Sequence, residues 1–224
     1  MQVVVTGASS PLGQALLHAI AQRGTLLRAD GQAVPVRRIL AVDRTQSPGG
    51  LFIDPRIEYV RGDYEMPRFL ARMMGTGTDS IFHLSVLDVD DSEPVGLLSL
   101  ETALERTVDT TRMLLDACQY QTAPVKLVLA GTQGGWPAGG ALPPGTRDTC
   151  AAMCELLLND SARRRLVDAR SVRLPVWGAG AVVDPADAAQ RLLRAHEVPR
   201  EDLPASAPPP VPPGADSPEP AGQP

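Results

Sequence analysis

A turn with two glycines near the start of the chain is the first feature whose residue types and spacing could do chemistry. In the stretch "QVVVTGASSPLGQALLHAI", the turn joins a short apolar run to a helical pattern and holds Gly7 and Gly13. Glycines let the backbone approach a phosphate closely, and the helix that follows presents its N-terminal amides and dipole to that charge. The turn predicts a phosphate-bearing ligand, and a purely structural strand-to-helix turn is the alternative.

Acidic side chains end the apolar runs that follow this turn. "LAVD" ends with Asp43, and "RGD" at 61–63 ends with Asp63. A carboxylate at the end of the second strand accepts hydrogen bonds from adenosine ribose hydroxyls and disfavours a 2'-phosphate, whereas Arg44 beside it favours one. Asp63 is suited to an adenine amino group. We therefore expect NAD as the cofactor, ahead of NADP, with a vestigial scaffold that binds neither as the alternative.

The strands and helices expected to carry these residues follow an alternating pattern. Strand-like apolar runs lie at 2–6, 38–43, 57–63, 80–85, 125–131 and 169–175, and helical patterns lie at 11–23, 66–74, 98–120, 148–166 and 185–196. Most of the runs are apolar on both faces, as expected where helices cover both sides of a parallel sheet. The pattern predicts an α/β protein with a doubly wound parallel sheet, the Rossmann fold.

Composition limits the partners and the domain organisation. The chain has 224 residues, 43% of them hydrophobic, and a formal net charge of -5. This size allows one core, and the charge provides no broad positive field for nucleic acid or a membrane surface. Without a targeting or membrane-spanning pattern, a cytoplasmic location is expected. The segment 204–224 holds nine prolines, so we expect one domain over 1–203 and a disordered proline-rich tail.

Other chemistry-bearing residue types give weaker patterns. The three cysteines are too few for a disulfide framework, and Cys150 and Cys154 suit one helix face, so buried reduced thiols are expected. His18 and His196 lack ligands at metal-binding spacings, so no metal site is expected. The arginine-rich run "ARRRLVDAR" favours a solvated helix end over a site for an acidic ligand.

The motifs quoted above, together with "ILAVDR", "IFHLS" and "CELLLNDSARRRLVDARSVRLP", resemble the extended short-chain dehydrogenases/reductases of the NAD-dependent epimerase/dehydratase family. The similarity covers about residues 1–198 and is closest to D-erythronate dehydrogenase-like members. The turn departs from the family's TGxxGxxG form because Ser10 stands at the middle glycine, which predicts weakened nucleotide binding. The cofactor-binding residues expected from the motifs and the resemblance are Gly7, Ser10, Pro11, Leu12, Gly13, Asp43, Arg44, Asp63, Tyr64 and Leu84.

The resemblance also implies a Tyr-x-x-x-Lys pair for proton transfer, and this chain has none. Aligned on "CELLLND", the tyrosine position is Arg147 and the lysine position is Ala151. Lys126 is the only lysine, and no tyrosine precedes it by four residues. Thr132 falls on the family's catalytic hydroxyl position and is our single catalytic candidate, with an ordinary strand-end threonine as the alternative.

Two further departures from the family and one strand-end histidine bear on function. Thr107 stands where the family has a helical asparagine of the proton relay. His83 either borders the cofactor or packs at a strand end. After "RLP" the chain passes to a segment that resembles one much further along in full-length relatives, so most of the substrate-binding lobe is expected to be absent. We expect a degenerate family member that takes a small hydroxylated or carbonyl ligand. A non-redox cyclase, lyase or isomerase and a non-catalytic partner protein are the alternatives, and a homodimer stays open.

Overall fold

A six-stranded parallel sheet forms the centre of the protein. The computed structural model describes residues 1–44, 50–62, 66–75, 77–88, 97–133, 145–175 and 184–198. The strand order is β5-β4-β1-β6-β7-β8. The strands are β1 (Gln2–Thr6), β4 (Arg38–Asp43), β5 (Ile57–Arg61), β6 (Thr78–His83), β7 (Lys126–Thr132) and β8 (Asp168–Leu174). This order is that of a doubly wound dinucleotide-binding sheet, which confirms the predicted fold class.

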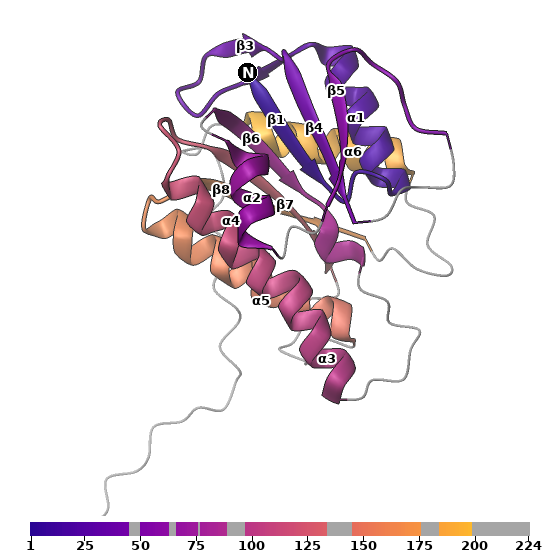
Figure 1. The fold of residues 1–224 in the computed structure, drawn as a ribbon, viewed down its shortest axis with the longest axis vertical. Helices are drawn as coiled ribbons and strands as arrows, with labels where there is room; N and C mark the ends of the chain where they lie inside the picture. Colours follow the sequence, from indigo (N-terminus) through magenta and orange to yellow (C-terminus); the bar gives the residue numbers. More distant parts are fainter. Residues whose placement is uncertain are drawn as a thin grey trace, which may run out of the picture.

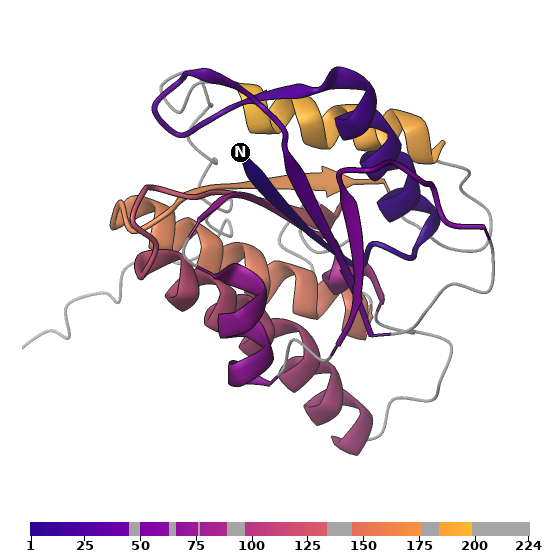
Figure 2. The same cartoon turned by 45° about the horizontal axis from the view of Figure 1, so that its top comes forward.

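Helices cover both faces of this sheet (Figure 1). The helices α1 (Pro11–Arg23) and α6 (Pro185–Glu197) lie side by side on one face. On the other face lie α2 (Pro67–Met74), α4 (Thr110–Gln119) and α5 (Thr146–Arg163), and the turned view separates the two layers (Figure 2). Each layer has its own apolar core, as the alternating apolar runs predicted.

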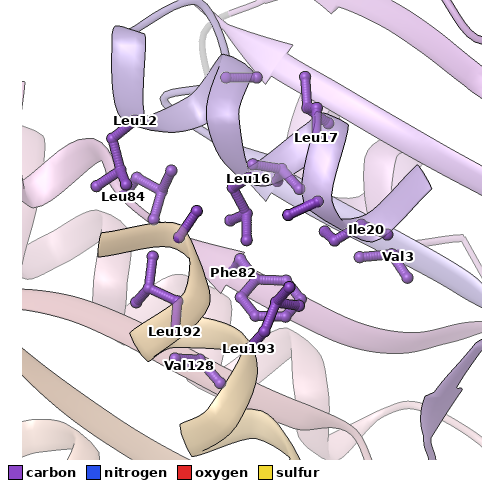
Figure 3. Packing of buried hydrophobic residues seen from close by; sticks show 14 of the residues in the cluster. Val3, Leu12, Leu16, Leu17, Ile20, Phe82, Leu84, Val128, Leu192 and Leu193 are labelled. Atoms are coloured by element: carbon purple, nitrogen blue, oxygen red, sulfur yellow. The ribbon is translucent and has the colours of Figure 1, made fainter. Parts of the chain in front are cut away.

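The core between α1, α6 and the sheet is built around Phe82 of β6. Leu16 of α1 and Leu193 of α6 lie over its ring, and all three side chains are buried (Figure 3). Leu12 and Leu84 close the same cluster near the start of α1, at the carboxyl ends of β1 and β6. This packing fixes the first turn of α1 over the sheet.

Two local features were not predicted. The strands β2 (Thr25–Leu27) and β3 (Ala33–Pro35) form a separate antiparallel pair after Gly24, whose φ of 70° ends α1. The expected helix over 98–120 is divided into α3 (Leu97–Leu104), the π-helical turn η2 (Glu105–Asp109) and α4. Short, half-exposed strands and a single wide helical turn leave little trace in hydrophobic periodicity.

Cationic side chains cap the C-terminus of α6 at the amino edge of the sheet. Lys126 Nζ donates to the carbonyl of His196 (2.8 Å), and Arg170 Nη1 donates to the carbonyls of Ala195 (3.1 Å) and His196 (2.9 Å). Arg170 is only 5% exposed. The interpretation of "ARRRLVDAR" as a solvated run is therefore wrong for its last arginine, because the carbonyls of a helix end need buried donors there.

The three cysteines are reduced and lie in the core. Cys118, Cys150 and Cys154 are buried free thiols, as expected. Burial raises the pKa of the Cys118 and Cys154 thiols to about 12.

Some of the sequence predictions fall on segments that the structure does not describe. Asp63, Tyr64 and the proline-rich segment 204–224 lie outside the described residues. Within the part of the chain that the structure describes, none of the helices has the length and apolar character that crossing a bilayer requires.

Candidate functional site

The turn between β1 and α1 leaves no room for side chains at its two glycines. A Cβ on Gly13 would lie 2.5 Å from the carbonyl oxygen of Gly7 and 2.6 Å from that of Ala8. Gly7 has a φ of +68°, and a Cβ there would lie 3.2 Å from the amide nitrogen of Ser85 after β6. Both glycines are therefore required by the close packing of the turn against the start of α1 and the end of β6.

Ser10 is the N-cap of α1 and closes the turn on itself. Its hydroxyl donates to the carbonyl of Gly7 (2.8 Å) and accepts from the amide of Gly13 (3.0 Å). Pro11 begins the helix and has no amide hydrogen to offer. The Ser10 hydroxyl thus supplies a hydrogen-bond acceptor at the start of α1, where the family resemblance predicted a glycine and a ligand phosphate.

Asp43, at the end of β4, is tied to the same turn. Its Oδ2 accepts a hydrogen bond from the backbone amide of Ser9 (2.8 Å), and the carbonyl of Val42 accepts from the amide of Ala8 (3.3 Å). Arg44 extends instead toward the π-helical turn η2, where Nη2 donates to the carbonyl of Arg106 (3.2 Å). The fold therefore joins the predicted phosphate turn and the predicted ribose carboxylate, which lie 30 residues or more apart in the sequence.

Two expected cofactor-binding residues have their side chains in the core. Leu12 is 2% exposed and Leu84 is 1% exposed, and both belong to the cluster under α1 and α6. The amide of Leu84 donates to the carbonyl and the hydroxyl of Thr6 (3.3 Å each). Only the backbone of these leucines is thus placed to border a ligand, and their side chains position the turn.

His83, at the end of β6, belongs to a buried polar network. The Thr111 hydroxyl donates to the carbonyl of Thr107 (2.7 Å), so it accepts from His83 Nε2–H (3.1 Å). His83 Nδ1 then accepts from the hydroxyls of Thr6 (2.7 Å) and Ser85 (3.2 Å). Burial lowers the pKa of His83 to about 3, so its ring is neutral. This network supports strand-end packing, the second of the two roles expected for His83.

The predicted catalytic hydroxyl already has a partner. The Thr132 hydroxyl, at the end of β7, donates to the carboxylate of Asp148 in the first turn of α5. Arg147 precedes Asp148 on that turn, and Ala151, which our alignment predicts at the position of the family lysine, is 2% exposed in the core beneath α5. The sequence analysis missed Asp148, although an acidic residue beside the tyrosine position was a visible signal.

An ion pair between a buried carboxylate and an exposed guanidinium fixes α5 beside this site. Glu155, one turn beyond Ala151, is buried, and both of its carboxylate oxygens accept from the guanidinium of Arg173 on β8 (2.8–3.2 Å). Gly131 of β7 is the register partner of Arg173, so the pair lies next to the end of β7 that carries Thr132. A paired, bidentate carboxylate of this kind holds the helix in place rather than exchanging protons.

These features define a doubly wound, dinucleotide-type α/β domain with a glycine turn and a threonine–carboxylate pair at strand ends along its carboxyl edge. The chain belongs to the NAD dependent epimerase/dehydratase family, whose sequence model matches residues 3–155. The family resemblance inferred from the sequence is thereby confirmed.

Individual relatives agree with this assignment. D-erythronate dehydrogenase from Cupriavidus necator is 32% identical over 78% of this chain, and the enzyme of the same name from Haemophilus influenzae is 30% identical over 78%. The alignments cover 55% and 54% of those relatives, so the chain spans about half their length.

Solved structures share the fold. A nucleoside-diphosphate-sugar epimerase from Agrobacterium tumefaciens superposes with a TM-score of 0.59 at 22% identity, covering 79% of this chain and 53% of that one. The dTDP-glucose 4,6-dehydratase DesIV from Streptomyces venezuelae, solved with NAD bound, also gives 0.59, at 19% identity and with coverage of 77% and 55%.

Proposed function

We propose that the protein binds an adenine nucleotide, NAD in preference to NADP, along the carboxyl edge of the sheet. The observation that carries this proposal is the joining of Asp43 to the phosphate turn through the 2.8 Å hydrogen bond from the Ser9 amide. Gly7 and Gly13 keep the turn tightly packed against the start of α1 and the end of β6, the form that a dinucleotide-binding turn takes. The bound NAD of DesIV, a protein of the same fold, supports the choice of ligand.

The choice of NAD over NADP rests on two neighbouring side chains. Asp43 places a carboxylate where a 2'-phosphate would be repelled, and one of its oxygens already points toward the turn. The Arg44 guanidinium, which would favour that phosphate, donates to the carbonyl of Arg106 instead. We propose that the remaining cofactor contacts come from Asp63 and Tyr64 and from the backbone of Ser10, Pro11, Leu12 and Leu84.

We further propose that the protein has lost the family's tyrosine–lysine redox chemistry. NAD, when bound, supplies a hydride acceptor, but oxidation of a hydroxyl also needs a base for the alcohol proton. The guanidinium of Arg147 has hydrogen-bond donors but no acceptor for a proton, and Ala151 has no ionisable group. The proposed ligand is a small hydroxylated or carbonyl compound. Two relatives are named D-erythronate dehydrogenase, which supports this class of ligand. We do not propose the dehydrogenase activity for this chain.

A second candidate function is a non-redox reaction. The contact between Thr132 and Asp148 favours it, because a carboxylate that accepts from a hydroxyl can receive a proton from a substrate held there. A third candidate, a non-catalytic binding protein, needs only the proposed nucleotide site beside Asp43. Turnover of a carbonyl compound that is abolished in Asp148→Asn would separate the second candidate from the third.

The experiment that tests nucleotide binding is native mass spectrometry of the purified protein, followed by calorimetry. We expect co-purified NAD(H), or saturable heat with NAD⁺ and less with NADP⁺. Asp43→Asn should reduce the preference for NAD⁺. A folded protein that shows no heat with either nucleotide at millimolar concentration would refute the proposal. The homodimer, the cytoplasmic location and the domain boundary at residue 203 stay predictions.

A further inference from the structure

The amides of the phosphate turn are almost all committed within the protein. The amide of Ala8 donates to Val42, that of Ser9 to Asp43, and that of Ser10 to the carbonyl of Gly7 (3.3 Å). A phosphate that entered this turn would therefore find its donors in use.

The start of α1 offers few donors as well. Pro11 has no amide hydrogen, and the amide of Gly13 donates to the Ser10 hydroxyl. The amide of Leu12 is the one first-turn donor without a hydrogen bond to another described residue. A helix N-terminus normally binds an anion through several such amides at once.

The Ser10 hydroxyl is held from both sides. Its oxygen accepts from Gly13 while its proton is donated to Gly7, so it satisfies one donor and one acceptor of the turn together. Rotating the side chain away to admit a phosphate would leave the Gly7 carbonyl without this donor. An N-cap hydroxyl and a ligand phosphate compete for the same amide, because each supplies an oxygen at the helix start.

We infer that the Ser10 hydroxyl takes the place of a ligand phosphate oxygen at the start of α1, so that the site selects its ligands by their adenosine end and gains little from a diphosphate. This inference rests on the proposed function, because it assumes that an adenine nucleotide binds beside Asp43. Ser10 is then a specificity-determining residue, and the preferred class is an adenosine compound in which the phosphates contribute little affinity.

The test compares adenosine and ADP by calorimetry at one fixed ionic strength. The quantity measured is the diphosphate gain, defined as the dissociation constant of adenosine divided by that of ADP. We expect a gain below about threefold in the natural protein. Ser10→Ala and Ser10→Gly both release the Gly13 amide and should raise the gain by about tenfold, the range of one hydrogen bond to a charged group.

Three variants together make the result specific. Ser10→Thr keeps a capping hydroxyl and should keep the low gain. Ser10→Ala keeps the Cβ and removes only the hydroxyl, so a rise confined to Ser10→Gly would overturn the role of the hydroxyl. Ser10→Gly also guards against poor folding, since glycine at an N-cap position stabilises a helix only slightly less than serine does.

The outcomes separate this inference from the proposed function. A gain of about tenfold or more in the natural protein, unchanged in Ser10→Ala, would overturn the inference and leave nucleotide binding standing. Equal binding of adenosine and ADP in every variant would overturn it as well. Absence of binding by both ligands in all variants, with folding shown by circular dichroism, would refute nucleotide binding together with the inference.

Discussion

The hydroxyl of Thr132 and the carboxylate of Asp148 are joined by a hydrogen bond at the point where β7 ends and α5 begins. In this arrangement the Thr132 hydroxyl proton is donated to Asp148, so the Thr132 oxygen can act toward a substrate only as a hydrogen-bond acceptor. The hydroxyl that we predict as catalytic is therefore held by a neighbouring carboxylate.

We predict that the protein does not oxidise D-erythronate or other four- and five-carbon sugar acids at the rate of a dehydrogenase. A positioned base contributes ~10²–10⁴-fold, so turnover should fall by at least about 100-fold below that of an enzyme with the tyrosine–lysine pair. The measurement follows NADH absorbance with a panel of these acids. Robust turnover that is unaffected by Thr132→Ala would contradict both the alignment at Arg147 and the predicted loss of redox activity.

Restoring the lysine should damage the fold. Ala151 is 2% exposed in the core beneath α5, so Ala151→Lys must bury a charge or displace the helix. We expect a loss of about 3 kcal/mol or more in the free energy of unfolding, measured by urea titration. Met153→Lys is the matched control, because Met153 lies on the same helix and is 39% exposed. Equal stability of the two lysine variants would show that Ala151 is not in the core.

The glycine turn provides a second matched pair. Gly13→Ala should lower the free energy of unfolding by about 2 kcal/mol or more, because its Cβ would meet backbone oxygens at 2.5 and 2.6 Å. Gly77→Ala should change it by less than about 0.5 kcal/mol, since nothing lies within 4 Å of a Cβ there. Thermal unfolding of both variants checks this contrast, and a fully stable Gly13→Ala protein would mean that the turn is more open than described.

Acid should destabilise the protein through two buried histidines. Burial lowers the pKa of His83 and of His196 to about 3, below the ordinary value of 6.5. The unfolded chain therefore takes up protons first as the pH falls, and the free energy of unfolding should decrease from about pH 6.5 toward pH 3. His83→Asn should make this decrease shallower. An identical slope in the His83 variant would contradict its assignment as a buried neutral ring.

Lys126 should matter for stability rather than for catalysis. Lys126→Met leaves the His196 carbonyl with Arg170 as its only cationic donor among the described residues, so we expect a loss of about 1–2 kcal/mol in unfolding free energy. Arg38→Met removes an exposed ion pair with Glu58 and should cost less than about 1 kcal/mol. Chemical denaturation of both variants provides the comparison. A larger loss for Arg38→Met would show that Lys126 is not needed to cap α6.

The element order, the fold class and the family could be predicted from local sequence patterns. Apolar runs such as "QVVVT" and "RILAVD" are local patterns, and burial on both faces of a parallel sheet requires them. The loss of the Tyr-x-x-x-Lys pair was also visible, because Lys126 is the only lysine in the chain. The turn with Gly7 and Gly13 was recognisable from spacing alone, since the constraint on both glycines arises within one strand, one turn and one helix.

The pairing of side chains across those elements could not be predicted from the sequence. The partners of Asp43, Thr132, Lys126 and Arg170 lie 16 to 70 residues away or across strands, so no local pattern indicates them. The second role of Ser10, as acceptor for Gly13 and donor to Gly7, likewise depends on how tightly the turn closes. Sequence periodicity reports which face of an element is buried, whereas hydrogen-bond pairing depends on distances that exist only once the sheet and its helices have packed together.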